Sequence, residues 1–262
     1  MNIISDTEYI ITKDVFAGGY LPSTIEKVSL ETVKAEKTNF IAPARQFNLF
    51  SEMPIAQDQM RRGTCATFAI SRVAEYLHEK QLSEQHLYNM AYHYYASQDS
   101  NIEGTTLEAV CEPLKRQGVC LEEIWPYYGE ITPNNFPQDP VPDKVKQAVK
   151  TKISSYRSVE INSSNKAIEI CNLIYNLNAP LVISIPIFWQ VCGWETGDFI
   201  ETPPNGTPVG GHHAISIFGY DMDLHFLILQ NSWGTDWGTL GTACISFEYI
   251  DKYLDDLFIL EK

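Results

Sequence analysis

Residues 59–69 read Gln-Met-Arg-Arg-Gly-Thr-Cys-Ala-Thr-Phe-Ala, and this stretch decides how the rest of the chain is interpreted. Thr64 is a residue type favoured at helix N-caps, and apolar residues recur at helical spacing from Cys65 onward. The pattern therefore predicts that Cys65 lies in the first turn of a helix. The free N–H groups and the dipole at that end favour an anion, so we expect a thiol that ionises more readily than usual. Taken alone, the pattern also fits a small buried hydrophobe that begins a core helix.

Two downstream motifs give Cys65 a chemical context. His212 and His213 precede an apolar run, 214–220, that has the length and endings of a buried strand. Only one of the two histidines can face a given site, because neighbours on a strand point to opposite faces. A second strand at 226–230 leads into Asn231-Ser232-Trp233-Gly234. The Asn231 amide could accept an imidazole N–H, and Trp233 could shield that hydrogen bond from water. Thiol, imidazole and amide are the three roles that nucleophilic catalysis needs.

Gln59 lies six residues before Cys65, on the loop that leads into the predicted helix. Its side-chain amide could reach back over the thiol. Together with the backbone N–H of Cys65 it would form a two-donor oxyanion hole, which is a large contribution to acyl transfer. The alternative is an ordinary solvated loop glutamine.

The order, spacing and local sequence of these motifs resemble the papain-like cysteine peptidases. The match consists of Gln59 before Cys65, His213 before Ala214, and the Asn-Ser-Trp-Gly segment ahead of a second Trp237-Gly238. The resemblance implies an α+β, papain-like fold, in which a helical half packs against a β-barrel-like half with the active-site cleft between them. It implies catalytic roles for Cys65, His213, Asn231 and Gln59. It also implies a substrate-binding surface formed by Gly63, Gly104, Thr105, Ala214 and Trp233.

Two positions depart from the usual family signature, which has a cysteine three residues before the nucleophile and a tryptophan after it. Arg62 and Ala66 occupy those positions here, so the disulfide that usually ties the nucleophile loop is absent. This version resembles bacterial branches of the family more than lysosomal cathepsins. Most of the six cysteines lie in apolar runs, and we expect few or no disulfides and a reducing compartment.

Composition sets further limits. The chain has 262 residues and a formal net charge of −14, which argues against nucleic acid and anionic membranes as partners. The N-terminus has neither a basic region nor an apolar segment, so we expect no signal peptide and a protein that is cytoplasmic or exported by another route. No Cys/His spacing typical of zinc is present, and we expect no metal and no cofactor.

The pattern along the chain changes twice, and it predicts three regions. Residues 1–45 are weakly patterned and are interpreted as an N-terminal extension or a short pro-segment. Residues 46–155 form a mainly helical half that carries the nucleophile. Residues 156–262 form a β-rich half that carries the base and its orienting amide, with strands expected at 156–161, 181–187, 214–220, 226–230 and 242–247 and one helix near 165–176.

Three functions remain open at this point. The first is a cysteine protease that hydrolyses protein or peptide substrates through a Cys65 thioester. The second uses the same thiol chemistry as an acyl transferase or an aminopeptidase. The third is a non-catalytic module that binds peptides on this scaffold. An active protease without a signal peptide or a long pro-domain would threaten its own cell, which suggests narrow specificity, a dedicated protein inhibitor, or a toxin or effector protease delivered to other cells.

Overall fold

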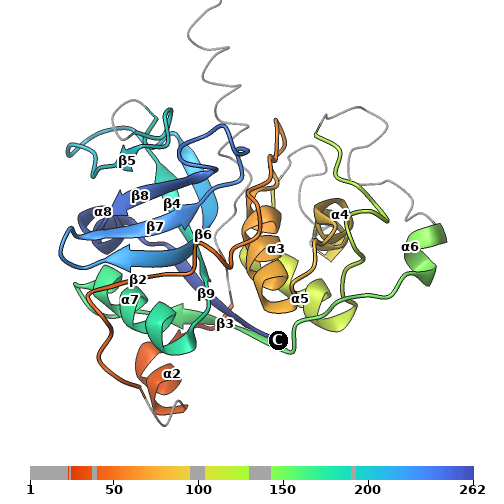
Figure 1. Cartoon of the computed structure of the whole chain (residues 1–262), viewed down its shortest axis with the longest axis horizontal. Coiled ribbons are helices and arrows are strands. Elements are labelled where there is room, and N and C mark those ends of the chain that lie inside the picture. Colours follow the sequence, from red (N-terminus) through yellow and green to blue (C-terminus); the bar gives the residue numbers. More distant parts are fainter. Residues whose placement is uncertain (1–22, 24, 37–39, 95–103, 130–142, 190–192) are drawn as a thin grey trace, which may run out of the picture.

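The computed structural model describes residues 23, 25–36, 40–94, 104–129, 143–189 and 193–262. Helices and strands separate into two halves (Figure 1). The helical half contains α3 (Cys65–His78), α4 (Glu84–Tyr94), α5 (Leu107–Arg116) and α6 (Asp143–Gln147). The other half is built on a sheet that is flanked by α7 (Lys166–Leu177) and α8 (Phe247–Tyr253). The short α2 (Leu30–Glu36) lies beside this second half.

Two helices of the first half, α4 and α5, follow residues whose side chains satisfy a free N–H group of the helix start. Ser83 Oγ accepts from His86 N ahead of α4, and Thr106 Oγ1 accepts from Ala109 N ahead of α5. Thr64 precedes α3, but its hydroxyl makes no capping hydrogen bond and instead pairs with the Tyr127 hydroxyl at 2.8 Å. The predicted start of α3 at Cys65 is therefore confirmed, whereas the predicted capping role of Thr64 is wrong.

Nine strands form one sheet in the described part of the chain, in the order β1-β3-β9-β4-β6-β7-β8-β5, with β2 paired to β6. Their bounds are β1 (Val28–Ser29), β2 (Gln46–Asn48), β3 (Ser155–Glu160), β4 (Leu181–Ile187), β5 (Phe199–Ile200), β6 (Gly211–Asp221), β7 (Phe226–Gln230), β8 (Thr242–Ser246) and β9 (Asp256–Glu261). All pairs are antiparallel except β1 with β3 and β5 with β8.

The helical half meets the sheet along one face of α3. Ala66, Ala69, Ile70 and Val73 of α3 belong to one buried cluster together with Val182 of β4, Ala214 of β6 and Phe258 of β9. Leu and Ile side chains of β4, β6, β7 and β9 form a second core under α7 and α8. The first turn of α3 is thereby held against the middle of the sheet, at Ala214.

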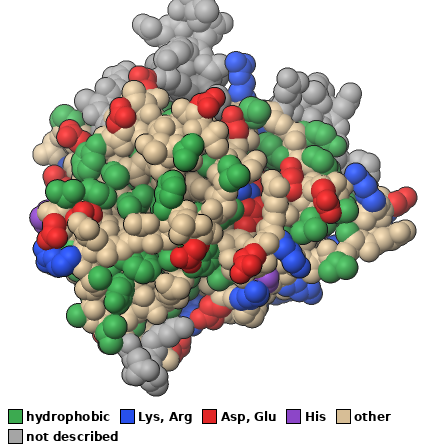
Figure 2. Space-filling view, viewed as in Figure 1, with side chains coloured by type: hydrophobic (Ala, Val, Ile, Leu, Met, Phe, Trp, Pro, Cys, Tyr) green, Lys and Arg blue, Asp and Glu red, His purple; other side chains and the backbone are tan. Residues whose placement is uncertain are grey.

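The papain-like α+β prediction is confirmed, although the strands follow an open path and "barrel-like" describes them only loosely. Residues 46–48, which we placed with the helical half, pair with β6 instead. Acidic and basic side chains are interspersed on the face shown in Figure 2. None of the described helices has the length and apolar character needed to cross a membrane.

Candidate active site

Cys65 begins α3, and its side chain is fully buried against the sheet. Cys65 belongs to the same buried cluster as Ala214 of β6. Ala214 directly follows His213 on β6, so the packing of α3 on β6 brings the predicted nucleophile and the predicted base to one place.

The His213 ring is oriented by Asn231. His213 Nε2 lies 2.8 Å from Asn231 Oδ1, and the same oxygen accepts from Ser232 N at 2.8 Å. An amide oxygen can only accept hydrogen bonds, so the proton between the two side chains is on His213 Nε2. Nδ1 of the neutral ring is then the acceptor. Nδ1 is buried and has no hydrogen-bond partner among the described residues. The ring is thus held in the tautomer that can take a proton from a thiol.

Four tryptophans surround this pair. The Trp233 ring lies 5.1 Å from the His213 ring, and Trp194 meets His213 edge-on at 6.3 Å. The Trp189 ring stacks on the Trp233 ring, with 5.4 Å between the ring centroids, and the Trp237 indole N–H donates to Trp194 O at 2.8 Å. The predicted shielding by Trp233 is therefore part of a larger aromatic cluster. Sequence reasoning did not assign Trp189 or Trp194, because isolated tryptophans outside a motif give no positional signal.

Gln59 is buried and not a solvated loop residue. The 57–59 segment runs beside 232–234: Gln59 N donates to Ser232 O at 2.8 Å, and Ser232 Oγ donates to Gln59 Oε1. The latter bond fixes the amide orientation, and Gln59 Nε2 donates to Arg62 O at 2.7 Å. An amide nitrogen carries a second N–H, and this is the one that the predicted oxyanion role requires. Ser232 is a contributor that sequence reasoning missed.

The electrostatics of the site differ from the expectation of an easily ionised thiol. Burial raises the pKa of the Cys65 thiol to about 12, and hydrogen bonds from the backbones of Ala214, Ala66 and Cys65 offset only part of this effect. Burial lowers the pKa of His213 to about 4, and the hydrogen bond to Asn231 acts in the opposite direction. Both shifts favour the uncharged thiol and imidazole, because desolvation penalises either charge. Burial of Cys65 therefore opposes the easy ionisation that a helix start favours.

The predicted substrate-binding residues come from both the helical half and the sheet half. Gly63 is buried in the loop before α3, and Ala214 is the residue whose backbone contacts the thiol. Gly104 has φ of +146°, a conformation that favours glycine, and its N–H donates to the Tyr88 hydroxyl at 3.3 Å. Thr105 follows it and is buried. Whether these residues bind substrate stays a prediction.

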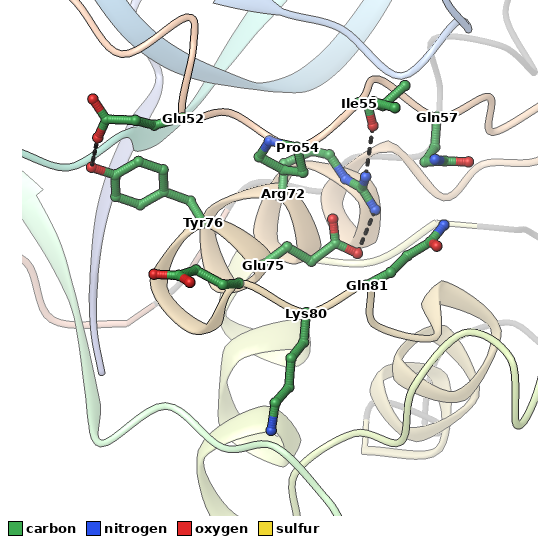
Figure 3. Close-up of a pocket in the computed structure, with 10 residues that line it drawn as sticks. Glu52, Pro54, Ile55, Gln57, Arg72, Glu75, Tyr76, Lys80 and Gln81 are labelled. Atoms are coloured by element: carbon green, nitrogen blue, oxygen red, sulfur yellow. Dashed lines mark hydrogen bonds and ion pairs between the residues drawn. The ribbon is translucent and has the colours of Figure 1, made fainter.

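A separate pocket of about 320 Å³ lies beside α3, between that helix and residues 52–57 (Figure 3). Its lining includes Arg72 and Glu75, which point toward each other, and the Arg72 guanidinium also donates to Ile55 O at 2.9 Å. Cys65 and His213 are not among its lining residues. Within the described ranges, no three His, Cys, Asp or Glu side chains gather as metal ligands would.

Comparison with known protein families identifies the family to which this chain belongs. The family model described as papain family cysteine protease matches residues 49–251. The chain belongs to the papain family. The matched region contains Cys65, His213, Asn231 and Gln59, and the predicted assignment to papain-like cysteine peptidases is confirmed.

Similar proteins come from several sources. An uncharacterized peptidase C1-like protein of Acanthamoeba polyphaga mimivirus is 22% identical over 92% of this chain and 71% of its own length. The viral cathepsin of Cydia pomonella granulosis virus is 25% identical over 83% of this chain and 61% of its own length. Among solved structures, xylellain, a cysteine protease from Xylella fastidiosa, superposes with a TM-score of 0.75 at 20% identity, covering 94% of this chain and 96% of that one.

Proposed function

We propose that this papain-family protein is a cysteine endopeptidase that cleaves protein or peptide substrates through an acyl-enzyme on Cys65. The observation that carries the proposal is the oriented imidazole: His213 Nε2 is held by Asn231, its unpartnered Nδ1 is buried, and Cys65 contacts the neighbouring Ala214. A base fixed in one tautomer beside a thiol is what nucleophilic catalysis needs and what a passive binding module does not.

The mechanism begins from the neutral pair. The Cys65 thiol passes its proton to His213 Nδ1 as sulfur attacks the carbonyl carbon of the scissile amide. The carbonyl oxygen becomes an oxyanion, which the Cys65 N–H and the Gln59 amide stabilise. His213 returns the proton to the leaving amine as the C–N bond breaks, leaving a thioester. Water, deprotonated by His213, then hydrolyses the thioester and restores the thiol.

The fully buried thiol has a consequence for substrates. A carbonyl can reach Cys65 Sγ only when the atoms that cover it move aside, since both Cys65 and His213 have no exposed surface. Exposure to a polar substrate backbone would relieve the desolvation that holds both groups neutral. This supports a protease whose catalytic pair becomes reactive on substrate binding, and it fits the predicted narrow specificity. A dedicated inhibitor, an effector role and a cytoplasmic location or non-classical export remain part of the proposal.

The test is active-site labelling followed by product analysis. A thiol-reactive epoxide should modify Cys65 selectively, as judged by peptide mapping, because the Asn231-oriented imidazole of His213 can take the proton of this thiol. Mass analysis of digested internally quenched peptides should show two fragments from an internal cut.

Other products would change the assignment. Release of single N-terminal residues would indicate an aminopeptidase, and amine-linked acyl products would indicate a transferase. Labelling spread evenly over several cysteines, with no peptide cleaved, would contradict catalysis altogether. The matched control is Cys65→Ala, which should lose the label at this position and all cleavage.

A further inference from the structure

Arg62 is a charged residue that lies three positions before the nucleophile and is only 1% exposed. Removing a guanidinium from water is costly unless its charge and its N–H donors are satisfied. A loop that only connects Gln59 to Cys65 would not need such a residue, so its burial calls for a role within the loop.

The Arg62 side chain reaches across the helical half. Its Nη1 donates to Gln85 Oε1 of α4 at 2.9 Å and to Tyr128 O at 3.0 Å. The guanidinium lies over the Tyr88 ring at 5.1 Å and over the Tyr127 ring at 5.4 Å. These contacts anchor the loop to α4 and to the chain segment at 127–128.

The same contacts connect to the predicted oxyanion and substrate groups. Tyr127 donates its hydroxyl to Gln59 O at 2.9 Å and pairs with Thr64 Oγ1, so it holds the loop on both sides of Arg62. The Tyr88 hydroxyl accepts from Gly104 N. The Arg62 carbonyl itself accepts from Gln59 Nε2 at 2.7 Å and from Thr64 N at 2.9 Å. The side chain therefore fixes the peptide group whose carbonyl orients the Gln59 amide.

We propose that Arg62 is a positioning residue for the oxyanion hole: its buried side chain fixes the 59–65 loop, and its carbonyl aims the Gln59 amide at the developing oxyanion. The proposal rests on the proposed function. Oxyanion stabilisation is realised in the transition state and not in substrate binding, so loss of Arg62 should lower kcat and leave KM nearly unchanged.

The experiment compares amide hydrolysis with alkylation of the same thiol. Iodoacetamide reacts with Cys65 by direct displacement of iodide and develops no oxyanion, so its rate reports the nucleophile alone. Arg62→Met should lower kcat by about 10- to 100-fold, a somewhat smaller effect than complete loss of an oxyanion donor. KM and the alkylation rate should stay within about threefold of the parent values. Arg62→Lys keeps the charge but not the planar fork, and it should recover only part of kcat.

Two further variants keep the test decisive. Arg116→Met replaces an exposed arginine of α5 and is the matched control, for which kcat should not change. If Arg62→Met fails to fold, Tyr127→Phe is the test variant. It keeps the ring under the guanidinium but removes the hydroxyl that holds Gln59 O and Thr64. It should lower kcat by about three- to tenfold without affecting the alkylation rate.

The outcomes separate the two proposals. If the parent is active and Arg62→Met leaves kcat unchanged, the role of Arg62 is overturned and the proposed function is not. Where Arg62→Met does not fold, an unchanged kcat in Tyr127→Phe has the same meaning. A parallel fall in kcat and alkylation would place the effect on the nucleophile or on folding, and it also overturns the proposal. A parent that is alkylated at Cys65 but cleaves no peptide overturns the proposed function and this inference with it.

Discussion

The two sides of the candidate site are held by different forces. On the sheet side, His213 sits on β6, opposite Ile185 of β4, and its ring lies among tryptophans. On the helical side, the residues around Cys65 are held by buried polar groups, including Arg62 and the Arg72–Glu75 pair shown in Figure 3.

This difference shows how a base and a nucleophile can be positioned independently. Sheet pairing and aromatic packing involve no charged side chains, so the base side needs few polar partners but tolerates no slip in strand register. The nucleophile side depends on buried hydrogen bonds and ion pairs. Arg72, for example, joins Ile55 O, Glu75 and Glu84 in one buried group. We therefore expect changes on the sheet side to affect chemistry, and changes on the helical side to affect stability as well.

The largest expected effect tests whether both sides contribute one reacting group each. Cys65→Ala should lower kcat/KM by at least about 10⁴-fold, and His213→Ala should do nearly the same, because either loss removes the proton transfer. Cys65→Ala should keep the fold, since it removes one atom from a buried helix start. His212→Ala is the control: His212 is partly exposed and bonds to Asp255 at 2.9 Å, so the loss should stay within about threefold. Equal losses from both histidine variants, measured on one cleavable peptide, would overturn the assignment of the base.

The next effect concerns the stability of the helical side. Arg72→Met leaves the Glu75 and Glu84 carboxyls buried without their cation, and should reduce the free energy of unfolding by about 3–5 kcal/mol. Burial, opposed by Arg72, raises the pKa of Glu75 to about 8, so the loss should be larger at pH 8 than at pH 5, where Glu75 is protonated. Denaturant unfolding measures this. Arg116→Met removes an exposed arginine from the buried Glu112, which keeps the Tyr156 hydroxyl as a donor, so it should cost less than about 1 kcal/mol. Equal losses in the two variants would contradict the distinction.

A smaller effect isolates the protonation of His213. Burial lowers its pKa to about 4, whereas the unfolded chain has an ordinary histidine near 6.5. Between these values the unfolded chain binds the proton and the folded chain does not, so this contribution to stability is lost as pH falls. Between pH 7.5 and pH 4.5, the free energy of unfolding of the parent should fall by about 2–3 kcal/mol more than that of His213→Gln. Every other titratable group is the same in the two proteins. If their free energies of unfolding change equally with pH, His213 is not buried as a neutral group.

The smallest effect tests the orientation of the base. Asn231→Ala frees the imidazole to rotate and lets water compete for its proton, and should lower kcat by about tenfold with little change in KM. Trp233→Ala should act in the same direction by admitting water to the His213–Asn231 contact. Steady-state kinetics on one peptide would show both effects. Unchanged turnover in both variants would reduce the trio to a Cys–His pair, with the Asn-Ser-Trp-Gly segment only a strand end.

Much of the sheet side could be predicted from the sequence. The strands expected at 181–187 and 226–230 have these bounds in the structure, and the helix expected near 165–176 is α7 at Lys166–Leu177. Runs of Leu, Ile and Val bounded by turn residues have few other interpretations. β9 and α8 were missed, although the apolar run 257–260 is a strand signal and Ser246 Oγ caps α8 by accepting from Tyr249 N.

The nucleophile side was predicted in position but not in environment. Local sequence placed Cys65 in the first turn of a helix, because apolar spacing fixes where a helix begins. It could not show that Ser232 orients Gln59 across 173 residues of chain, or that the Arg62 charge is buried between two tyrosines. The described cysteines carry no disulfide, and Cys192 lies outside the described residues.

The sequence by itself determined which residue types meet in this protein: a thiol at a helix start, an imidazole at the start of a strand, and an amide at the end of the next. Those features follow from short-range periodicity and residue chemistry. Only the tertiary structure decided their protonation state. A helix start favours a thiolate, but packing of α3 on β6 removes Cys65 from water, and this burial raises the thiol pKa.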